Sequence, residues 1–202
     1  MGHRERLLAG AKRSLYERGY SHTTARDIVE ASGTNLASIG YHFGTKEALL
    51  NSAMMEAVGE WGEELERILL SGADEDADPM ERFEEVWTRI IASFEAHRPA
   101  LVASFEAFVQ SEHSAELRKQ ITAGQEEARM WLAELFGRIG GTAGEGSARA
   151  VGSFYLALLN GVMVQWLLAP DLAPSGLDMS EALRTILESV RPAEQQAPPQ
   201  SA

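Results

Sequence analysis

The chain has 202 residues, of which 45% are hydrophobic and 24% charged, and this composition excludes a disordered or fibrous protein. It has no Cys, which excludes disulfide frameworks, thiolate metal sites and cysteine nucleophiles. Its net charge of -12 at pH 7 argues at first sight against nucleic acid as a partner, because phosphate attracts Lys and Arg.

The first 50 residues differ in charge from the rest. They hold seven of the 18 Lys and Arg and five of the 30 Asp and Glu, which leaves 11 basic and 25 acidic residues beyond them. A basic end on an acidic body permits DNA binding, although an acidic protein that binds other proteins has the same pattern. Residues 1–15 lack the continuous apolar segment of a secretory signal, so we expect a cytoplasmic protein.

Apolar residues recur at spacings of three and four, without convincing two-residue alternation, which predicts an all-α fold. A first helix is expected over residues 4–18, ending at Gly19. Thr24 and the acid three residues later form a capping-box pattern for a second short helix. Asn35 is a good N-cap for a third, which should end near Gly44.

Longer helices are predicted beyond this point. One begins at Lys46 and leaves the N-terminal region, and another begins at Pro79 after an acidic loop and ends near Arg98, with Pro99 starting a new helix. Three more are expected over 114–139, 151–169 and 180–190, with a Gly-rich connector before the second of them. Residues 192–202 have the Ala, Gln and Pro composition of a disordered tail.

The most specific pattern is a set of three segments: 19–29 (GYSHTTARDIV), 31–33 (ASG) and 38–50 (SIGYHFGTKEALL). Together they resemble the TetR family of transcriptional regulators. The resemblance covers residues 4–55 and extends beyond them only in layout. It implies a three-helix, homeodomain-like helix-turn-helix domain over 1–47 that binds DNA, followed by a helical bundle over 48–191 that binds a ligand and dimerises.

A short helix, a glycine turn and a second short helix can lay the second helix in the major groove of DNA. The resemblance implies that residues 35–41 form this recognition helix and that Arg26 reaches a guanine, for which Arg has the best shape. Gly40 stands where many relatives carry an aromatic residue, so one phosphate contact is lost there. The residues predicted to contact DNA are Thr24, Arg26, Asn35, Leu36, Ala37, Ser38, Tyr41, His42 and Lys46.

These DNA contacts divide into two kinds, and several have a simpler alternative. Leu36, Ala37 and Ser38 would face the bases, whereas the phosphates would be positioned by Thr24, Tyr41, His42 and Lys46, together with the backbone N–H groups at the two helix starts. Tyr41 could belong in part to the small core. His42 could be a surface or capping histidine, and Lys46 a solvated residue of a first helical turn.

The apolar helix over 151–169 is nearly long enough to span a membrane, but Asn160 and Gln165 interrupt it and positively charged flanks are lacking. In TetR-like proteins the last two long helices of two subunits form a four-helix dimer interface, which would cover it. Burial inside one subunit is the alternative. The residues predicted at the interface are Val151, Phe154, Tyr155, Leu158, Val162, Trp166, Leu183 and Leu187.

Six aromatic side chains and one methionine of the middle helices could line an apolar pocket, although such residues are more often core than ligand contacts. The candidates are Trp61, Trp87, Phe94, Phe105, Phe108, Met130 and Trp131. Other sites fail on inspection: the Gly-rich segment 141–147 lacks the lysine of a phosphate-binding loop, and the acids of 74–78 lack the calcium-loop pattern. We expect no metal, no cofactor and no catalytic set.

The resulting hypothesis is a homodimeric, non-enzymatic regulator, most simply a repressor, that binds a palindromic operator and is released by a small apolar or amphipathic effector. Activation instead of repression stays open at this point. Two rivals also remain: a helical protein that binds small molecules without touching DNA, and an acidic protein-protein adaptor. The identity of the effector and the operator sequence do not follow from the residues.

Overall fold

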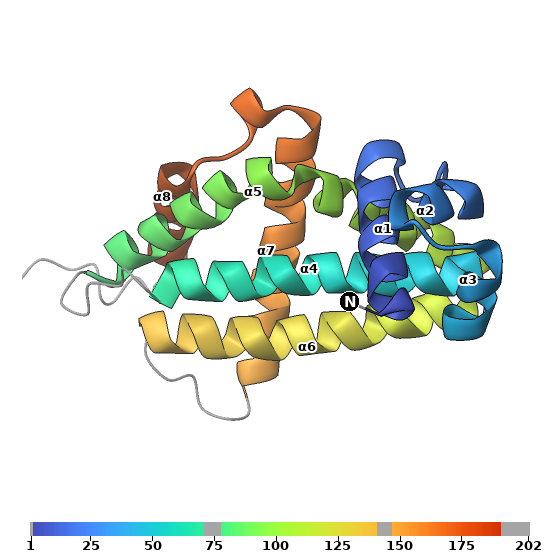
Figure 1. The fold of residues 1–202 in the computed structure, drawn as a ribbon. Helices are drawn as coiled ribbons and strands as arrows, with labels where there is room; N and C mark the ends of the chain where they lie inside the picture. Colours follow the sequence, from blue (N-terminus) through green and yellow to red (C-terminus); the bar gives the residue numbers. More distant parts are fainter. Residues whose placement is uncertain (1, 71–77, 141–146, 191–202) are drawn as a thin grey trace, which may run out of the picture.

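A computed structural model of the chain describes residues 2–70, 78–140 and 147–190, apart from the side chains of 69–70 and 138–140. Every regular element within these ranges is helical, which confirms the predicted all-α fold (Figure 1). Most of the predicted acidic loop (71–77), most of the Gly-rich connector (141–146) and the predicted tail (192–202) lie outside the described residues.

Three short helices gather at one end of the molecule: α1 (His3–Arg18), α2 (Ala25–Ser32) and α3 (Leu36–Phe43). Thr24 and Asn35 cap α2 and α3 as predicted. Gly33 ends α2 with a φ of 61°, a left-handed conformation that glycine adopts without steric cost. This turn sets the direction in which α3 leaves α2.

The next helix, α4 (Lys46–Leu70), runs from this end along the length of the molecule. Its first turns belong to the N-terminal core, where Leu49, Leu50 and Met54 pack with residues of α1, α2 and α3. Two alanines of the following helix, Ala103 and Ala107, and Leu117 further along the chain belong to the same core. The core therefore extends beyond residue 47, and the division between residues 47 and 48 stays a prediction.

The helix α5 (Pro79–Gln110) is continuous through Pro99, so the prediction that Pro99 starts a new helix is wrong. Proline removes one backbone donor and usually ends or kinks a helix. Here Pro99 is exposed, while Phe94, Ala100 and Leu101 on either side of it are buried at helical spacing. The burial of these neighbours offsets the lost hydrogen bond and keeps α5 helical over both halves.

The remaining helices are α6 (Ala115–Gly140), α7 (Ala148–Leu168) and α8 (Gly176–Ser189), with short 3₁₀ helices η1 (Ser111–His113) and η2 (Pro170–Leu172) before α6 and α8. The helix α8 begins four residues before the predicted start at 180. Ser175 caps it, since its hydroxyl accepts from the backbone N–H of Asp178 and that carboxylate accepts from the backbone N–H of Ser175. This capping box was present in the sequence and was missed.

The larger core fills the space between α4, α5, α6 and α7, and α8 packs against α5. Its buried members are mainly aromatic and large aliphatic side chains: Trp61, Leu65, Phe83, Val86, Trp87, Ile90, Phe94, Leu101, Leu132, Leu135, Phe136, Leu159, Val162, Met163 and Trp166. Among the described helices, only α7 is long and apolar enough to cross a bilayer, a test that the core helix of a soluble protein also passes.

Candidate nucleic-acid interface

The start of α3 is held by a small network around its cap. The side-chain oxygen of Asn35 accepts from the backbone N–H of Ser38 at 3.0 Å and from the Ser38 hydroxyl at 3.2 Å. His3, at the start of α1, lies 3.5 Å from the same hydroxyl. The network fixes the first turn of α3 while leaving acceptor capacity on Ser38.

One face of α3 is turned to solvent. Leu36 is 54% exposed, Tyr41 is 86% exposed, and Ala37 and Gly40 between them are exposed as well. On the opposite face Ile39 is buried in the N-terminal core. An exposed apolar Leu and Tyr on one face of a short helix are available for contact with another molecule.

Arg26 lies on the exposed side of α2, in its first turn. Within the described part of the chain, no acceptor binds its guanidinium. Its neighbour Asp27 is occupied, since it accepts from the backbone N–H and the hydroxyl of Thr24 at 2.8 and 2.7 Å. These hydrogen bonds, the one from the Thr24 hydroxyl first, lower the pKa of Asp27. Asp27 is therefore ionised and committed to the cap, and Arg26 remains available.

Two further predicted contacts are partly engaged inside the protein. The Lys46 ammonium donates to the backbone carbonyl of Thr23 at 3.0 Å and lies 3.5 Å from the Glu47 carboxylate. An ammonium has three donors, so these contacts leave it able to reach a phosphate. His42 is half-buried, with its ring edge-on to that of Tyr41 at 4.8 Å between centroids. The structure thus brings α2, α3 and the start of α4 together at one end of the protein.

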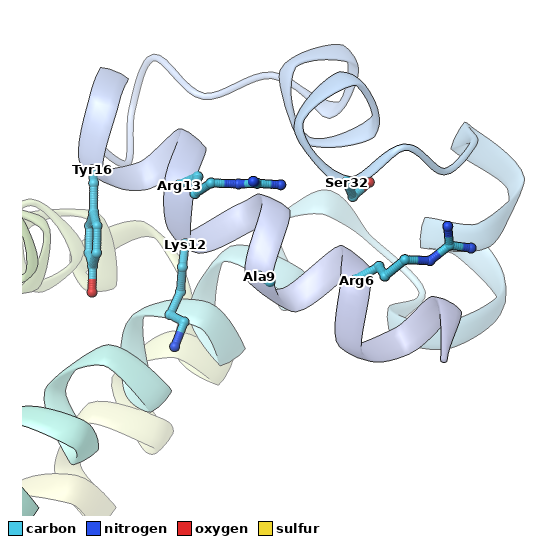
Figure 2. Close-up of a pocket in the computed structure, with 6 residues that line it drawn as sticks. All are labelled: Arg6, Ala9, Lys12, Arg13, Tyr16 and Ser32. Atoms are coloured by element: carbon cyan, nitrogen blue, oxygen red, sulfur yellow. The ribbon is translucent and has the colours of Figure 1, made fainter. Parts of the chain in front are cut away.

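Sequence reasoning missed the part that α1 takes in this end of the molecule. The guanidinium of Arg4 stacks over the ring of Phe43 at 5.3 Å from its centroid. A hollow of about 450 Å³ also follows α1, lined by Arg6, Ala9, Lys12, Arg13, Tyr16 and Ser32 (Figure 2). The cluster of basic residues within residues 4–18 was the available signal.

Two of the hollow's cations are already bound to the protein. Lys12 forms ion pairs with Glu56 and Glu60 of α4 at 2.8 and 2.6 Å, and Arg13 donates to the carbonyl of Ala31 at the end of α2. Burial lowers the pKa of Lys12, but the two carboxylates outweigh this and raise it overall. These contacts join α1 to both α2 and α4, so we regard the hollow as structural.

A second feature that the sequence did not indicate is a joint between α5 and the turn after α1. The carboxylate of Glu106 accepts from the backbone N–H groups of Tyr20 and Ser21 at 2.5 and 3.2 Å. Gln110, one turn further along α5, lies 3.5 Å from the Ser21 hydroxyl. The C-terminal end of α5 is therefore hydrogen-bonded directly to the segment that leads into α2.

The candidate ligand residues divide by burial. Trp61, Trp87 and Phe94 are buried in the larger core, Phe105 and Trp131 are half-buried and pack against it, and Phe108 and Met130 are exposed. The buried indole of Trp61 donates to the Ser93 hydroxyl at 3.0 Å. The buried indole N–H of Trp87 has no hydrogen-bond partner in the part of the chain that the structure describes. The structure brings the first five together around one core and leaves the last two outside it.

The candidate interface residues also divide by burial. Val162 and Trp166 are buried inside the subunit, and Tyr155 stacks on Phe136 at 3.6 Å, so all three contact the subunit's own core. Val151, Leu158 and Leu183 are half-buried, whereas Phe154 and Leu187 are about half exposed, at 52% and 47%. The apolar part of α7 that is open to a partner is an exposed stripe: Phe154, Ala157, Gly161, Val164 and Leu168.

Comparison with known proteins gives the same two-part arrangement. A family model described as "Bacterial regulatory proteins, tetR family" matches residues 7–53, and one described as "Tetracyclin repressor-like, C-terminal domain" matches residues 78–193. The HTH-type transcriptional regulator TtgR of Pseudomonas putida is 26% identical, over 93% of this chain and 91% of its own.

Two further similar proteins cover very different shares of this chain. The HTH-type transcriptional repressor AcnR of Corynebacterium efficiens is 37% identical over 60 residues, which are 30% of this chain and 32% of the relative. The crystal structure of the multidrug binding protein EbrR complexed with imidazole has a TM-score of 0.66 and 20% identity, covering 99% of this chain and 98% of that one. This second likeness concerns the fold.

Proposed function

The chain belongs to the TetR family of transcriptional regulators, and we propose that it is a repressor that binds a palindromic operator as a homodimer and is released by a small apolar or amphipathic effector. The observation that carries the DNA-binding part is the solvent-facing side of α3, with Leu36, Ala37 and Tyr41 exposed, together with Arg26 exposed on the preceding helix and without an acceptor among the described residues. As a regulator that reads operator DNA, the protein would act in the cytoplasm and would not be an enzyme, in keeping with a family described as regulatory proteins.

In the proposed complex α3 enters the major groove from its N-terminal end. Leu36 and Ala37 offer apolar contact to a thymine methyl group, while Ser38 can bond a base edge and Arg26 a guanine. Tyr41, His42, Lys46 and Thr24, with the backbone N–H groups at the starts of α2 and α3, would hold the phosphates. Hydrogen-bond readout of bases would then rest mainly on Arg26.

The apolar stripe on α7 supports a homodimer. Phe154, Val164 and Leu168 are 52%, 38% and 81% exposed, and Ile186 and Leu187 of α8 add exposed apolar surface. Exposed apolar side chains along one face of a helix are often covered by a partner. Pairing of α7 and α8 about a two-fold axis would form a four-helix contact, and a two-fold dimer matches a palindrome with half-sites one DNA turn apart.

The path of α5 supports release by an effector. Its first half contributes Phe83, Trp87 and Phe94 to the larger core, and its last turns reach the DNA-binding end through Glu106. A molecule that shifts α5 within the core would therefore move the turn before α2. We infer that the effector favours a dimer whose two α3 helices no longer fit successive grooves, and so opposes DNA. The printed name of EbrR, a multidrug binding protein, supports a small-molecule effector.

The proposal is tested by selecting duplexes from a random DNA pool with the full-length protein. We expect enrichment of a palindrome with half-sites about 34 to 36 Å apart, bound more weakly at higher salt. The printed name of AcnR, a repressor, supports loss of transcription from a promoter that carries the selected site. No enrichment at low salt would favour a small-molecule-binding protein or an adaptor that does not use DNA, and raised transcription would indicate an activator.

A further inference from the structure

The indole N–H of Trp87 is a buried donor without an acceptor. Trp87 lies on α5 at the centre of the larger core, with no exposed surface, and none of its described surroundings accepts from Nε1. Leaving a buried donor unsatisfied costs about 1 to 3 kcal/mol, so native proteins rarely keep one without a use. The indole of Trp61, in the same core, is satisfied by the Ser93 hydroxyl at 3.0 Å.

Flat aromatic side chains surround this donor. The rings of Phe83 and Phe136 lie 6.1 and 6.3 Å from that of Trp87, centroid to centroid. Phe136 in turn stacks on Tyr155, at 3.6 Å and 6° between the ring planes. Burial raises the pKa of the Tyr155 hydroxyl, which therefore stays neutral near pH 7. The aromatic rings around Trp87 would favour contact with a planar apolar molecule.

The buried residues of the larger core around Trp87 are all uncharged among those that the structure describes. No Lys, Arg, Asp or Glu of the described residues falls among the buried ones. Glu84, on the turn before Trp87, accepts from the Ser180 hydroxyl of α8 at 3.0 Å and is half-buried, as is Arg82. Because transfer of an unpaired ion into such a core is costly, a ligand bound here would be uncharged.

We propose that Trp87 selects the effector: its indole N–H donates to a neutral, planar aromatic molecule that carries a hydrogen-bond acceptor and packs against the rings of Phe83 and Phe136, the two that neighbour Trp87. The inference rests on the proposed function, since it names the chemical class of the effector and the residue that reads it. A fully apolar molecule of the same shape would contact the same rings and leave the N–H unpaired.

Quinoline and naphthalene test the proposal, because they have the same shape and only quinoline has an acceptor nitrogen. Calorimetric titration of the full-length protein, without DNA, gives a dissociation constant for each. We expect Trp87→Phe to lower the ratio of the naphthalene constant to the quinoline constant by about 2- to 12-fold, the value of one neutral hydrogen bond. Trp61→Phe, which also removes an indole but one already bonded to Ser93, should leave the ratio unchanged.

A measurement on the unmutated protein keeps the test valid if Trp87→Phe does not fold. The chain has 4 Trp, so a spectrum of protein labelled with ¹⁵N in its indoles is simple. Quinoline should move one indole N–H proton downfield and naphthalene should not. The proposal is overturned if neither compound binds, or if Trp87→Phe leaves the ratio of the two dissociation constants unchanged. It is also overturned if quinoline moves no indole N–H proton, or if the anion 2-naphthoate binds more tightly than quinoline. None of these outcomes affects the operator selection, which involves no ligand.

Discussion

Different kinds of residue pattern define the helices at the two ends of this chain. In the DNA-binding end, short-range polar contacts define each element: Thr24 caps α2, Asn35 caps α3, and Gly33 turns the chain between them. In α7, whose start has no side-chain cap among the described residues, apolar residues at helical spacing define the helix, and similar side chains are buried in one place and exposed in another. Trp166 is 7% exposed, while Leu168 two residues later is 81% exposed.

The difference teaches what kind of signal survives in a sequence. A cap joins residues three positions apart, so its partners are visible without the fold. An apolar stripe predicts that a helix has a covered face but not whether core, ligand or a second subunit covers it. The four experiments below test this contrast, from the largest expected effect to the smallest.

Val164→Glu should give the largest effect, because it places a charge in the apolar stripe of α7. If a second subunit covers this stripe, the variant should be monomeric by sedimentation, since an unpaired charge is costly in an interface. A monomer binds only one half-site, so the affinity for the operator should fall by about 10²- to 10⁴-fold.

Val109→Glu is the matched control for this variant. Val109 is 62% exposed near the C-terminal end of α5, away from α7 and α8. It should leave both the sedimentation and the operator affinity as they are. A Val164→Glu variant that still sediments as a dimer would show that another surface joins the subunits, and the exposed stripe would then need a different partner.

The crossing of α6 and α7 is the next most sensitive place. A Cβ added to Gly152 would lie 2.0 Å from the carbonyl oxygen of Arg129, a backbone atom that cannot move aside easily. Gly152→Ala should therefore lower the free energy of unfolding by about 3 kcal/mol in urea titrations. Gly59→Ala, at an exposed position of α4 with nothing nearby, should instead stabilise by about 0.5 to 1 kcal/mol. Equal changes in the free energy of unfolding for the two variants would show that α6 and α7 do not pack this closely at Gly152.

The features that the Val164 and Gly152 variants test differ in how far the sequence alone predicts them. The all-α fold, the short N-terminal helices and their caps followed from local patterns and from the resemblance of residues 4–55. The approach of Gly152 to Arg129 could not be predicted, because it depends on where two helices cross. The same is true of Val162 and Trp166, which were expected at a subunit interface and are buried inside one subunit.

The two errors about helix starts have different origins. Pro99 was expected to begin a helix because proline lacks a backbone donor, but burial of Phe94 and Leu101 on either side keeps α5 continuous. Ser175 was overlooked as the start of α8, although its capping box was readable. In the first case packing overrode a local signal, and in the second a local signal was present and not used.

Arg26→Ala tests the polar end by removing its unpaired cation. If the guanidinium contacts a guanine, affinity for the selected operator should fall by about 5- to 150-fold, with relaxed preference at one base pair of each half-site. Helix content and sedimentation should not change, since Arg26 is exposed and unpaired among the described residues. Arg67→Ala, on α4 outside this end, is the control in the gel-shift titration. An affinity equal to that of the original protein would remove Arg26 from the interface.

The smallest expected effect concerns the joint between the two ends. Glu106→Gln keeps the size of the side chain but replaces a charged acceptor of the Tyr20 and Ser21 N–H groups with a neutral one. Because hydrogen bonds to charged groups are worth about twice neutral ones, the variant should lose about 1 kcal/mol of stability. Amide hydrogen exchange at Tyr20 and Ser21 should become faster, while exchange in α7 stays unchanged.

The joint also carries the proposed coupling, so the variant has a second readout. If α5 transmits the effector's influence through Glu106, the same ligand should release Glu106→Gln from DNA less completely than the original protein. Glu95→Gln, exposed on the same helix, should release normally. Normal release by Glu106→Gln, together with faster exchange at Tyr20, would leave Glu106 as a stabilising contact only and would move the coupling to α4 or α6, the other long helices that enter both cores.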